Sequence, residues 1–127
     1  CRPDGTDIQV HAGGGMDNPV ELAFNQEGEI FGTVNLFQGT PRSDAIVHWV
    51  HGGVYPRSDQ EPVIGEFKRT GDPMPPLAHL GPAAPSAVAY YRSGTFGAEY
   101  RGNLFTSQFN MHKVQRHILE RDGATVR

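Results

Sequence analysis

The sequence predicts an all-β fold, and three observations support this prediction. The apolar residues occur in short runs whose β-branched and aromatic character suits strands. The 127 residues include 16 glycines and 10 prolines, and such frequent breaks favour many short strands over long helices. Near the N-terminal end, the apolar runs 20–24 and 30–34 flank the polar turn 25–28, which is the pattern of a β-hairpin.

Further strands are expected on either side of this hairpin. Residues 8–10 alternate between apolar and polar side chains, and residues 45–50 form a β-branched and aromatic run that ends at Gly52-Gly53. Residues 87–91 and 103–106 have the composition of two more strands.

The segment 114–119 allows two interpretations. As a helix it would place Val114, His117 and Ile118 on one face, whereas the Asp122-Gly123 turn directly after it favours a strand in a hairpin. We expect the strand.

Between residues 54 and 85 the composition changes. The segment holds most of the prolines of the chain, and because proline cannot donate to a strand ladder, regular pairing is not expected there. One short strand is predicted at 63–67. A loop of this length is either a functional element such as a lid or a solvated excursion on the surface.

A faint internal repeat indicates how the strands are grouped. Residues 2–6 resemble residues 121–125, and each segment reads as an Asp-Gly turn before a strand. Four-stranded units with weak similarity are typical of β-propeller blades. The predicted organisation is a partial β-propeller with a blade at 14–53, a long Pro-rich loop at 54–85, a blade at 86–120 and a further strand at 121–127. We expect this to be a piece of a longer protein.

Charge and cysteine content exclude several classes of function. The formal net charge of −3 and the absence of a basic stripe argue against a nucleic-acid partner. Cys1 is the only cysteine, so there is no intrachain disulfide and no Cys-based metal site. No apolar run approaches the ~18 residues of a membrane-spanning segment, and no signal peptide is recognisable in this chain.

Three segments carry a resemblance to a known family. Residues 18–33, with Asn18-Pro19, Ala23-Phe24 and Phe31-Gly32-Thr33, resemble a blade of soluble quinoprotein sugar dehydrogenases, and more closely of the membrane-bound dehydrogenases of planctomycete-type bacteria. The segments 47–55 and 90–105 are similar to the strand and Gly-Gly-x-Tyr corner that follow, and to the phrase Y-R-G-N-L-F of the next blade.

The resemblance implies a six-bladed propeller, of which this chain would supply about two blades, in an exported or periplasmic protein. It implies pyrroloquinoline quinone (PQQ) and calcium as cofactors, and a sugar or another alcohol as the small-molecule substrate. The family also includes fusions to c-type cytochrome domains. The catalytic histidine of the family would lie upstream of this chain.

The family pattern places the first candidate site residues before the hairpin and after its second strand. The resemblance gives Asp17 and Asn18 as contacts to the quinone or to calcium, and Asn35 as a candidate metal ligand. Asp17 stands where the sugar dehydrogenases typically have an arginine, and a carboxylate repels the carboxylates of the quinone. The alternative for Asp17 and Asn18 is an Asx turn that fixes the backbone before Pro19.

Two histidines complete the set of candidates. His51 lies at a strand end beside Gly52-Gly53, where it could serve as a cofactor contact, a metal ligand or a proton acceptor. His112, with Asn110, lies in a tight connection that approaches the central face in the family. For both, the alternative is a structural role in a turn.

Six aromatic residues resemble a sugar-stacking set, but core packing is the simpler interpretation because aromatic side chains bury a large area. They are Tyr90, Tyr91, Phe96, Tyr100, Phe105 and Phe109. Three functions remain open: a segment of a dehydrogenase-like propeller that oxidises sugars or alcohols, a non-catalytic propeller that binds carbohydrate or protein, and a propeller hydrolase of the lactonase type with calcium held by Asn18 and Asp17.

Overall fold

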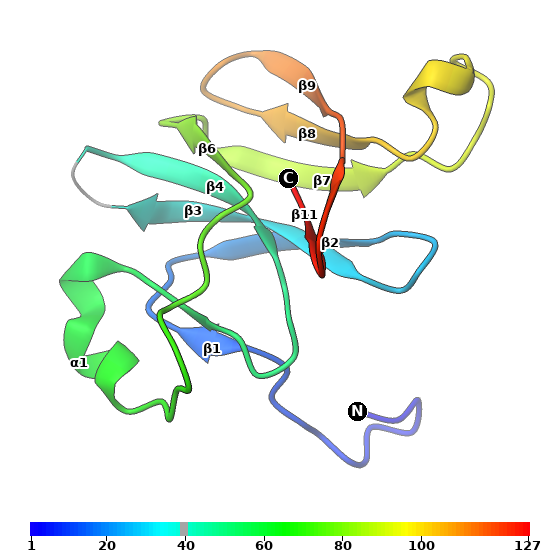
Figure 1. The fold of residues 1–127 in the computed structure, drawn as a ribbon. Helices are drawn as coiled ribbons and strands as arrows, with labels where there is room; N and C mark the ends of the chain where they lie inside the picture. Colours follow the sequence, from blue (N-terminus) through cyan, green and yellow to red (C-terminus); the bar gives the residue numbers. More distant parts are fainter. Residues whose placement is uncertain (39–40) are drawn as a thin grey trace.

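The regular structure consists of short β-strands and a few helical turns (Figure 1), so the predicted all-β class is confirmed. It is a computed structural model that describes residues 1–38 and 41–127. The strands are β1 (Gly13–Gly14), β2 (Pro19–Phe24), β3 (Ile30–Gln38), β4 (Ser43–His48), β5 (Val54–Tyr55), β6 (Ala78–Gly81), β7 (Pro85–Tyr90), β8 (Leu104–Gln108), β9 (Lys113–His117), β10 (Arg121–Asp122) and β11 (Thr125–Val126). The helical turns are η1 (Ser58–Gln60), α1 (Glu61–Gly65) and η2 (Ala98–Tyr100).

The first sheet contains β2, β3, β4 and β6, in that order and all antiparallel. β2 and β3 form the predicted hairpin, and Asn25 closes its turn by accepting the Glu29 N–H on its side-chain oxygen at 2.8 Å. Every residue of β4 is buried because both faces of this central strand are covered.

The second sheet contains β7, β8 and β9, again antiparallel and in sequence order. β10 and β11 form a hairpin at the C-terminal end, and β1 pairs with β5 in parallel. The triple glycine permits this last pairing, since a Cβ on Gly14 would lie 2.4 Å from the Tyr55 carbonyl oxygen.

The β2–β3 and β7–β8 hairpins repeat the same backbone plan. In the first, the register shifts by one residue between Pro19 and Glu21, and in the second between Pro85 and Ala87. A residue with positive φ precedes each proline: Asn18 at +28° and Ala84 at +46°. The carbonyl of each of these residues accepts an equivalent N–H across the hairpin, from Asn35 at 3.3 Å and from Phe109 at 3.1 Å. Two segments about 66 positions apart by residue number thus share one geometry.

The main core lies between the two sheets, where β2 and β3 pack against β7. It comprises Ala23, Phe31 and Ile46 from the first sheet, Val88 and Leu104 from the second, and Val126 from the C-terminal hairpin. Burial of a side chain such as Phe31 contributes about 1.5–3 kcal/mol.

A second cluster covers the opposite face of the first sheet. Its buried residues are Val34, Phe37, Ala45, Val47, Trp49 and Tyr55. The Tyr55 hydroxyl accepts the Val50 N–H at 2.9 Å and donates to the His48 carbonyl, so this phenol fixes the turn between β4 and β5. Burial raises the pKa of Tyr55.

Two expectations for the Pro-rich segment are wrong. Residues 63–67 are not a strand: helix α1 covers Glu61–Gly65, since Pro62 suits the first turn of a helix and Ile64 alone is buried. Regular pairing does occur at Ala78–Gly81, because β6 lies beyond the clustered prolines and its backbone is free to pair with β4.

Three further expectations concern other segments. Residues 8–10 form no strand, and Ile8 and Val10 are 81% and 79% exposed. Residues 113–117 are a strand rather than a helix, as expected. The interpretation of the six aromatic residues as core is wrong for Phe96 and Phe109, which are 67% and 73% exposed because both lie in turns beyond the sheet. The other four are half-buried, and of these Tyr90 packs against the main core.

Candidate functional site

The candidate residues lie at two different ends of the sheets. We call the end that carries the β3–β4 connection and the β8–β9 turn the Asn18 end; in Figure 1 it is the left side of both sheets. Asp17, Asn18, Asn35 and His112 belong to this end, because β2 begins after Asn18 and His112 lies in the β8–β9 turn. His51 lies beyond the C-terminal end of β4, at the opposite end.

A buried carboxylate holds the Asn18 end together. Asp44, which is 0% exposed, accepts the Leu36 N–H at 2.8 Å and the Ala84 N–H at 2.7 Å. It therefore joins the end of the first sheet to the start of the second. Leu36 and Ala84 both have positive φ, at +54° and +46°, and such strained backbone persists where its surroundings hold it. The sequence analysis missed Asp44, since an Asp beside a turn gives no signal of burial.

Asp17 forms an ion pair with the guanidinium group of Arg57. Its carboxylate lies 3.4 Å from Arg57 Nη1, and Arg57 also makes two bonds to Asp59, at 2.7 and 2.9 Å. The bond to Asp59 raises the pKa of Arg57, which therefore stays charged. Two carboxylates around one cation leave a net negative charge at this point.

The residues present do not fit the cofactors that the resemblance implies. The negative charge around Asp17 repels an anionic quinone. Calcium takes six to eight oxygen ligands, but within residues 1–38 and 41–127 no group of three or more His, Cys, Asp or Glu side chains could hold a metal ion. Asn35 has a buried Oδ1 without a partner among the described residues, and its backbone N–H donates across the β2–β3 hairpin to the Asn18 carbonyl at 3.3 Å.

His112 lines a shallow groove on the second sheet. The groove has a volume of about 460 Å³ and is lined by Ser86, Ser107, Gln108, Phe109, His112 and Lys113. His112 is exposed and adopts a φ of +50° in the turn. None of the other four candidates lines this groove. Its wall combines an exposed aromatic ring with hydroxyl, amide, imidazole and ammonium groups.

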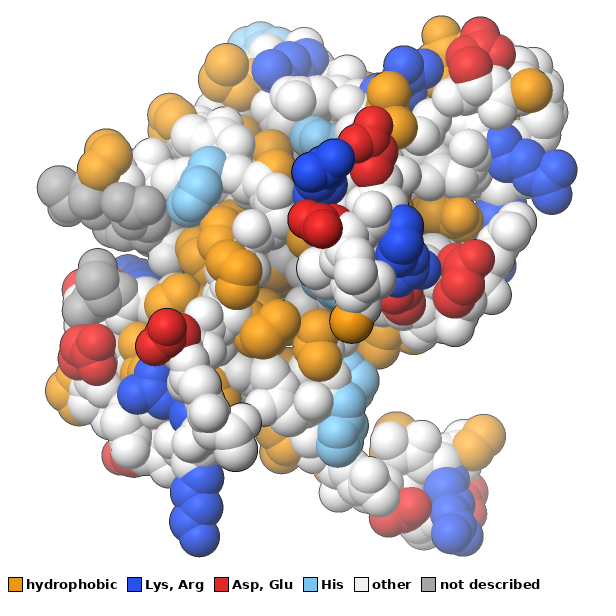
Figure 2. All heavy atoms as spheres, viewed as in Figure 1, with side chains coloured by type: hydrophobic (Ala, Val, Ile, Leu, Met, Phe, Trp, Pro, Cys, Tyr) orange, Lys and Arg blue, Asp and Glu red, His pale blue; other side chains and the backbone are white. Residues whose placement is uncertain are grey.

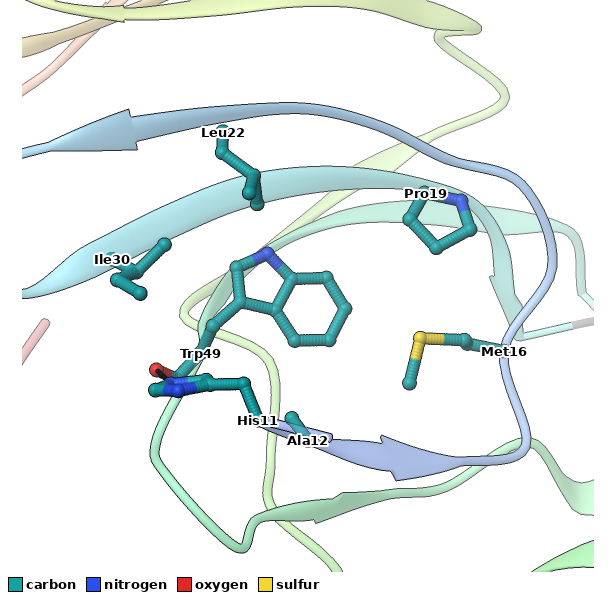
Figure 3. Close-up of a pocket in the computed structure, with 7 residues that line it drawn as sticks. All are labelled: His11, Ala12, Met16, Pro19, Leu22, Ile30 and Trp49. Atoms are coloured by element: carbon teal, nitrogen blue, oxygen red, sulfur yellow. Dashed lines mark hydrogen bonds between the residues drawn. The ribbon is translucent and has the colours of Figure 1, made fainter. Parts of the chain in front are cut away.

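An apolar cavity of about 270 Å³ lies on the face of the first sheet that points away from the second sheet (Figure 3). It is lined by His11, Ala12, Met16, Pro19, Leu22, Ile30 and Trp49. The indole of Trp49 packs directly against the backbone of Gly32: a Cβ atom added at Gly32 would overlap Nε1 of Trp49. This indole N–H is buried and has no partner among the described residues. None of the five candidates lines this cavity.

His51 has a histidine neighbour that the sequence analysis did not pair with it. The ring centres of His51 and His11 are 5.3 Å apart, with an angle of 75° between the ring planes. Both residues are exposed and line a cavity of about 340 Å³. The distance of forty residues between them in the chain hides this contact from the sequence.

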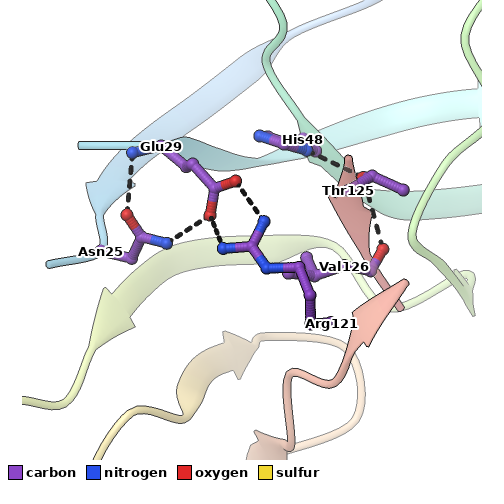
Figure 4. Close-up of polar contacts among 6 residues, drawn as sticks. All are labelled: Asn25, Glu29, His48, Arg121, Thr125 and Val126. Carbon is purple, nitrogen blue, oxygen red and sulfur yellow. Dashed lines mark hydrogen bonds and ion pairs between the residues drawn. The ribbon is translucent and has the colours of Figure 1, made fainter. Parts of the chain in front are cut away.

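A polar network attaches the C-terminal hairpin to the first sheet (Figure 4). Arg121 donates to both oxygens of Glu29, at 2.7 and 3.2 Å, and Asn25 also donates to Glu29. These bonds, chiefly the one from Arg121, lower the pKa of Glu29. His48 Nδ1 lies 3.0 Å from Thr125 Oγ1, and burial lowers the pKa of this histidine. The network is structural, because the guanidinium and the carboxylate satisfy each other.

Comparison with known proteins finds no family model, no curated protein and no solved structure that matches this chain. Among the described residues, no helix has both the length and the apolar character needed to cross a bilayer.

Proposed function

We propose that the two sheets are consecutive blades of a β-propeller, and that the chain supplies about two blades of a six-bladed ring. The repeated register of the β2–β3 and β7–β8 hairpins supports this proposal, since propeller blades are equivalent antiparallel sheets packed face to face. β2 and β7 would be the equivalent strands of adjacent blades, and they pack against each other.

The exposed apolar edge of the first sheet at Leu22 also supports further blades. By the repeat, Leu22 is equivalent to Val88, and Ile30 to Leu104. Val88 and Leu104 are buried against the first sheet at 4% and 0% exposure, whereas Leu22 is 53% exposed and lines the apolar cavity. Leu22, at the β2 edge of the first sheet, is thus exposed where its equivalent in the second sheet is packed, while Val34, Ala45 and Val47 on the same face are buried by the second cluster.

This part of the proposal is tested by self-association. A chain with such an exposed apolar edge should associate as its concentration rises, and Leu22→Glu should reduce the association, as measured by light scattering of size-exclusion fractions. Val114→Glu, at a residue 69% exposed on β9, is the matched control. Equal association of the wild type and the Leu22 variant contradicts the packing argument.

The function that the geometry supports best is the binding of a small hydroxylated molecule such as a sugar in the His112 groove. One observation carries it: an aromatic ring 73% exposed, Phe109, borders a groove whose other walls are polar. Sugars bind through stacking on such rings and through hydrogen bonds to groups of this kind. A volume of about 460 Å³ is within the range of small-molecule sites.

Saturation-transfer NMR with a panel of monosaccharides (glucose, galactose, mannose and sorbose) tests this function. We expect a signal that falls at least tenfold in Phe109→Ala and is weakened in His112→Ala. Phe96→Ala is the control, because Phe96 is 67% exposed but does not line the groove. Absence of a signal for the whole panel, or an equal loss in the control, rejects the groove as the binding site.

The second candidate is a dehydrogenase-like protein acting on sugars or alcohols, whose redox cofactor is held outside this chain. The Asn18-Pro19 corner and its hairpin, which carry the resemblance, favour it. Calorimetric titration of the full-length protein with PQQ, with and without calcium, separates the two candidates. Calcium-dependent binding supports the dehydrogenase, and its absence leaves the non-catalytic binding propeller.

A further inference from the structure

We propose that His11 and His51 together bind a divalent transition-metal ion, of the class of Zn²⁺, Ni²⁺ or Cu²⁺. This site is independent of the His112 groove, since it lies at the opposite end of the sheets. Figure 2 shows histidine side chains gathered where the N-terminal segment joins the body of the molecule.

The backbone holds both histidines in place before any ligand binds. The Gly52 N–H donates to the His11 carbonyl at 2.7 Å, and the Gly13 N–H donates to the Gly53 carbonyl at 3.0 Å. The β1–β5 pairing continues this ladder. The turn that carries His51 is itself fixed by Tyr55, so the two rings are presented by ordered backbone on both sides.

The tautomer of His11 suits metal binding. Its Nε2 lies 2.9 Å from the Trp49 carbonyl oxygen, which can only accept a hydrogen bond. Nε2 therefore carries the proton, and in the neutral ring Nδ1 carries the free lone pair. Metal-binding histidines commonly donate their second N–H to a backbone carbonyl in this manner.

The spacing of the rings also suits a shared ion. Two imidazoles whose nitrogens lie 2.0–2.1 Å from one tetrahedral metal place their ring centres roughly 5–6 Å apart. The observed separation is 5.3 Å. His51 is exposed on its turn, so its ring has room to rotate and direct a nitrogen toward the ion.

The surroundings leave space for the rest of the coordination sphere. The cavity of about 340 Å³ that both rings line is also bordered by Cys1, Arg2, Asp7 and Gln9. Asp7 accepts a bond from Gln9 at 3.1 Å and lies 3.7 Å from Arg2, and among the described residues no third His, Cys, Asp or Glu joins the two rings, so water completes the coordination sphere. Imidazole ligands favour zinc, nickel and copper, whereas calcium prefers an all-oxygen set. The site is therefore open and held by two protein nitrogens.

The single tryptophan provides a direct readout. Trp49 is the only tryptophan of the chain and its carbonyl contacts His11, so Cu²⁺ bound at this point should quench the intrinsic fluorescence. All titrations use Cys1→Ser protein, which prevents copper from reacting with the exposed thiol. Calorimetric titration with Zn²⁺ provides an independent affinity.

We expect His11→Ala and His51→Ala each to weaken Cu²⁺ and Zn²⁺ binding at least tenfold, while the exposed His112→Ala leaves both unchanged. His51→Ala decides the test if His11→Ala fails to fold, because His51 lies on an exposed turn; a thermal melt checks each variant. The proposal is overturned if the Cys1→Ser protein does not bind either ion, if the His51 variant binds as tightly as its parent, or if His112→Ala causes an equal loss.

Discussion

Replacement of Asp44 tests whether a single buried carboxylate joins the two sheets. In Asp44→Ala, the N–H groups of Leu36 and Ala84 lose their acceptors. A hydrogen bond to a charged group contributes about 1.5–3 kcal/mol, so two such bonds amount to roughly 3–6 kcal/mol. Without these bonds, Leu36 and Ala84 can leave their strained positive-φ conformations, which offsets about 1 kcal/mol or more of the loss. We therefore expect a loss of about 2–5 kcal/mol.

The assay is urea unfolding followed by the fluorescence of Trp49, with an unchanged slope and a lower midpoint. A protein of this size has a stability of about 5–15 kcal/mol, so the alanine variant could unfold. Asp44→Asn keeps one acceptor oxygen and should lose about half as much. Amide exchange at Leu36 and Ala84 should accelerate more than exchange in the centre of β4.

Arg42→Ala is the control for charge alone. Arg42 lies 3.8 Å from the Asp44 carboxylate but is 45% exposed, so its removal should cost less than about 0.5 kcal/mol. The reasoning is refuted if Asp44→Ala stays within about 1 kcal/mol of the wild type, or if the two alanine variants lose equal stability.

Three further predictions concern packing and pH. Gly32→Ala should destabilise the fold by about 1–3 kcal/mol and shift the fluorescence of Trp49, because the new methyl group overlaps the indole; an unchanged spectrum contradicts this. The pKa of Glu29 is lowered mainly by Arg121, so the stability from this pair is present above the unfolded pKa of about 4.3 and is lost as pH falls through the folded pKa. Arg121→Met should therefore lose less stability between about pH 5 and pH 3 in urea unfolding, and an unaltered acid profile argues against the pair. Burial lowers the pKa of His48, so this histidine is protonated in the unfolded chain before it is protonated in the folded one, and stability declines as pH falls below about 6.5. His48→Gln should reduce the change in the free energy of unfolding between pH 7 and pH 5, and an equal change in the wild type and the variant refutes this.

Local patterns predicted the strands, and distant contacts account for most of what was missed. The hairpin around Asn25 follows from apolar runs and a polar turn, which neighbouring residues determine. Burial of Asp44 depends on Ala84, forty residues away, and the pairing of His11 with His51 depends on the β1–β5 ladder. The strand predicted at 63–67 is wrong because Pro62 lies in the first turn of helix α1, a position that proline favours.

The candidate site was predicted less well, because family spacing gives positions but not partners. Asp17 precedes Asn18 in the sequence, but its ion pair with Arg57 arises from the fold of the β5–α1 region. The separation of His51 from the other candidates follows from strand direction: β4 begins at the Asn18 end and finishes at the opposite one.

The internal repeat shows which features of Asn18 the turn before β2 needs: its backbone conformation, but not its side-chain amide. Ala84 adopts the same left-handed conformation before proline, and its carbonyl accepts the equivalent bond. The backbone plan therefore needs no side-chain amide at this position. By the same equivalence, Asn35 of the first unit corresponds to Phe109 of the second. The two units thus place an amide and an aromatic ring at matching points of one backbone plan, so the amide side chains of Asn18 and Asn35 are not required for the turn and its cross-strand bond.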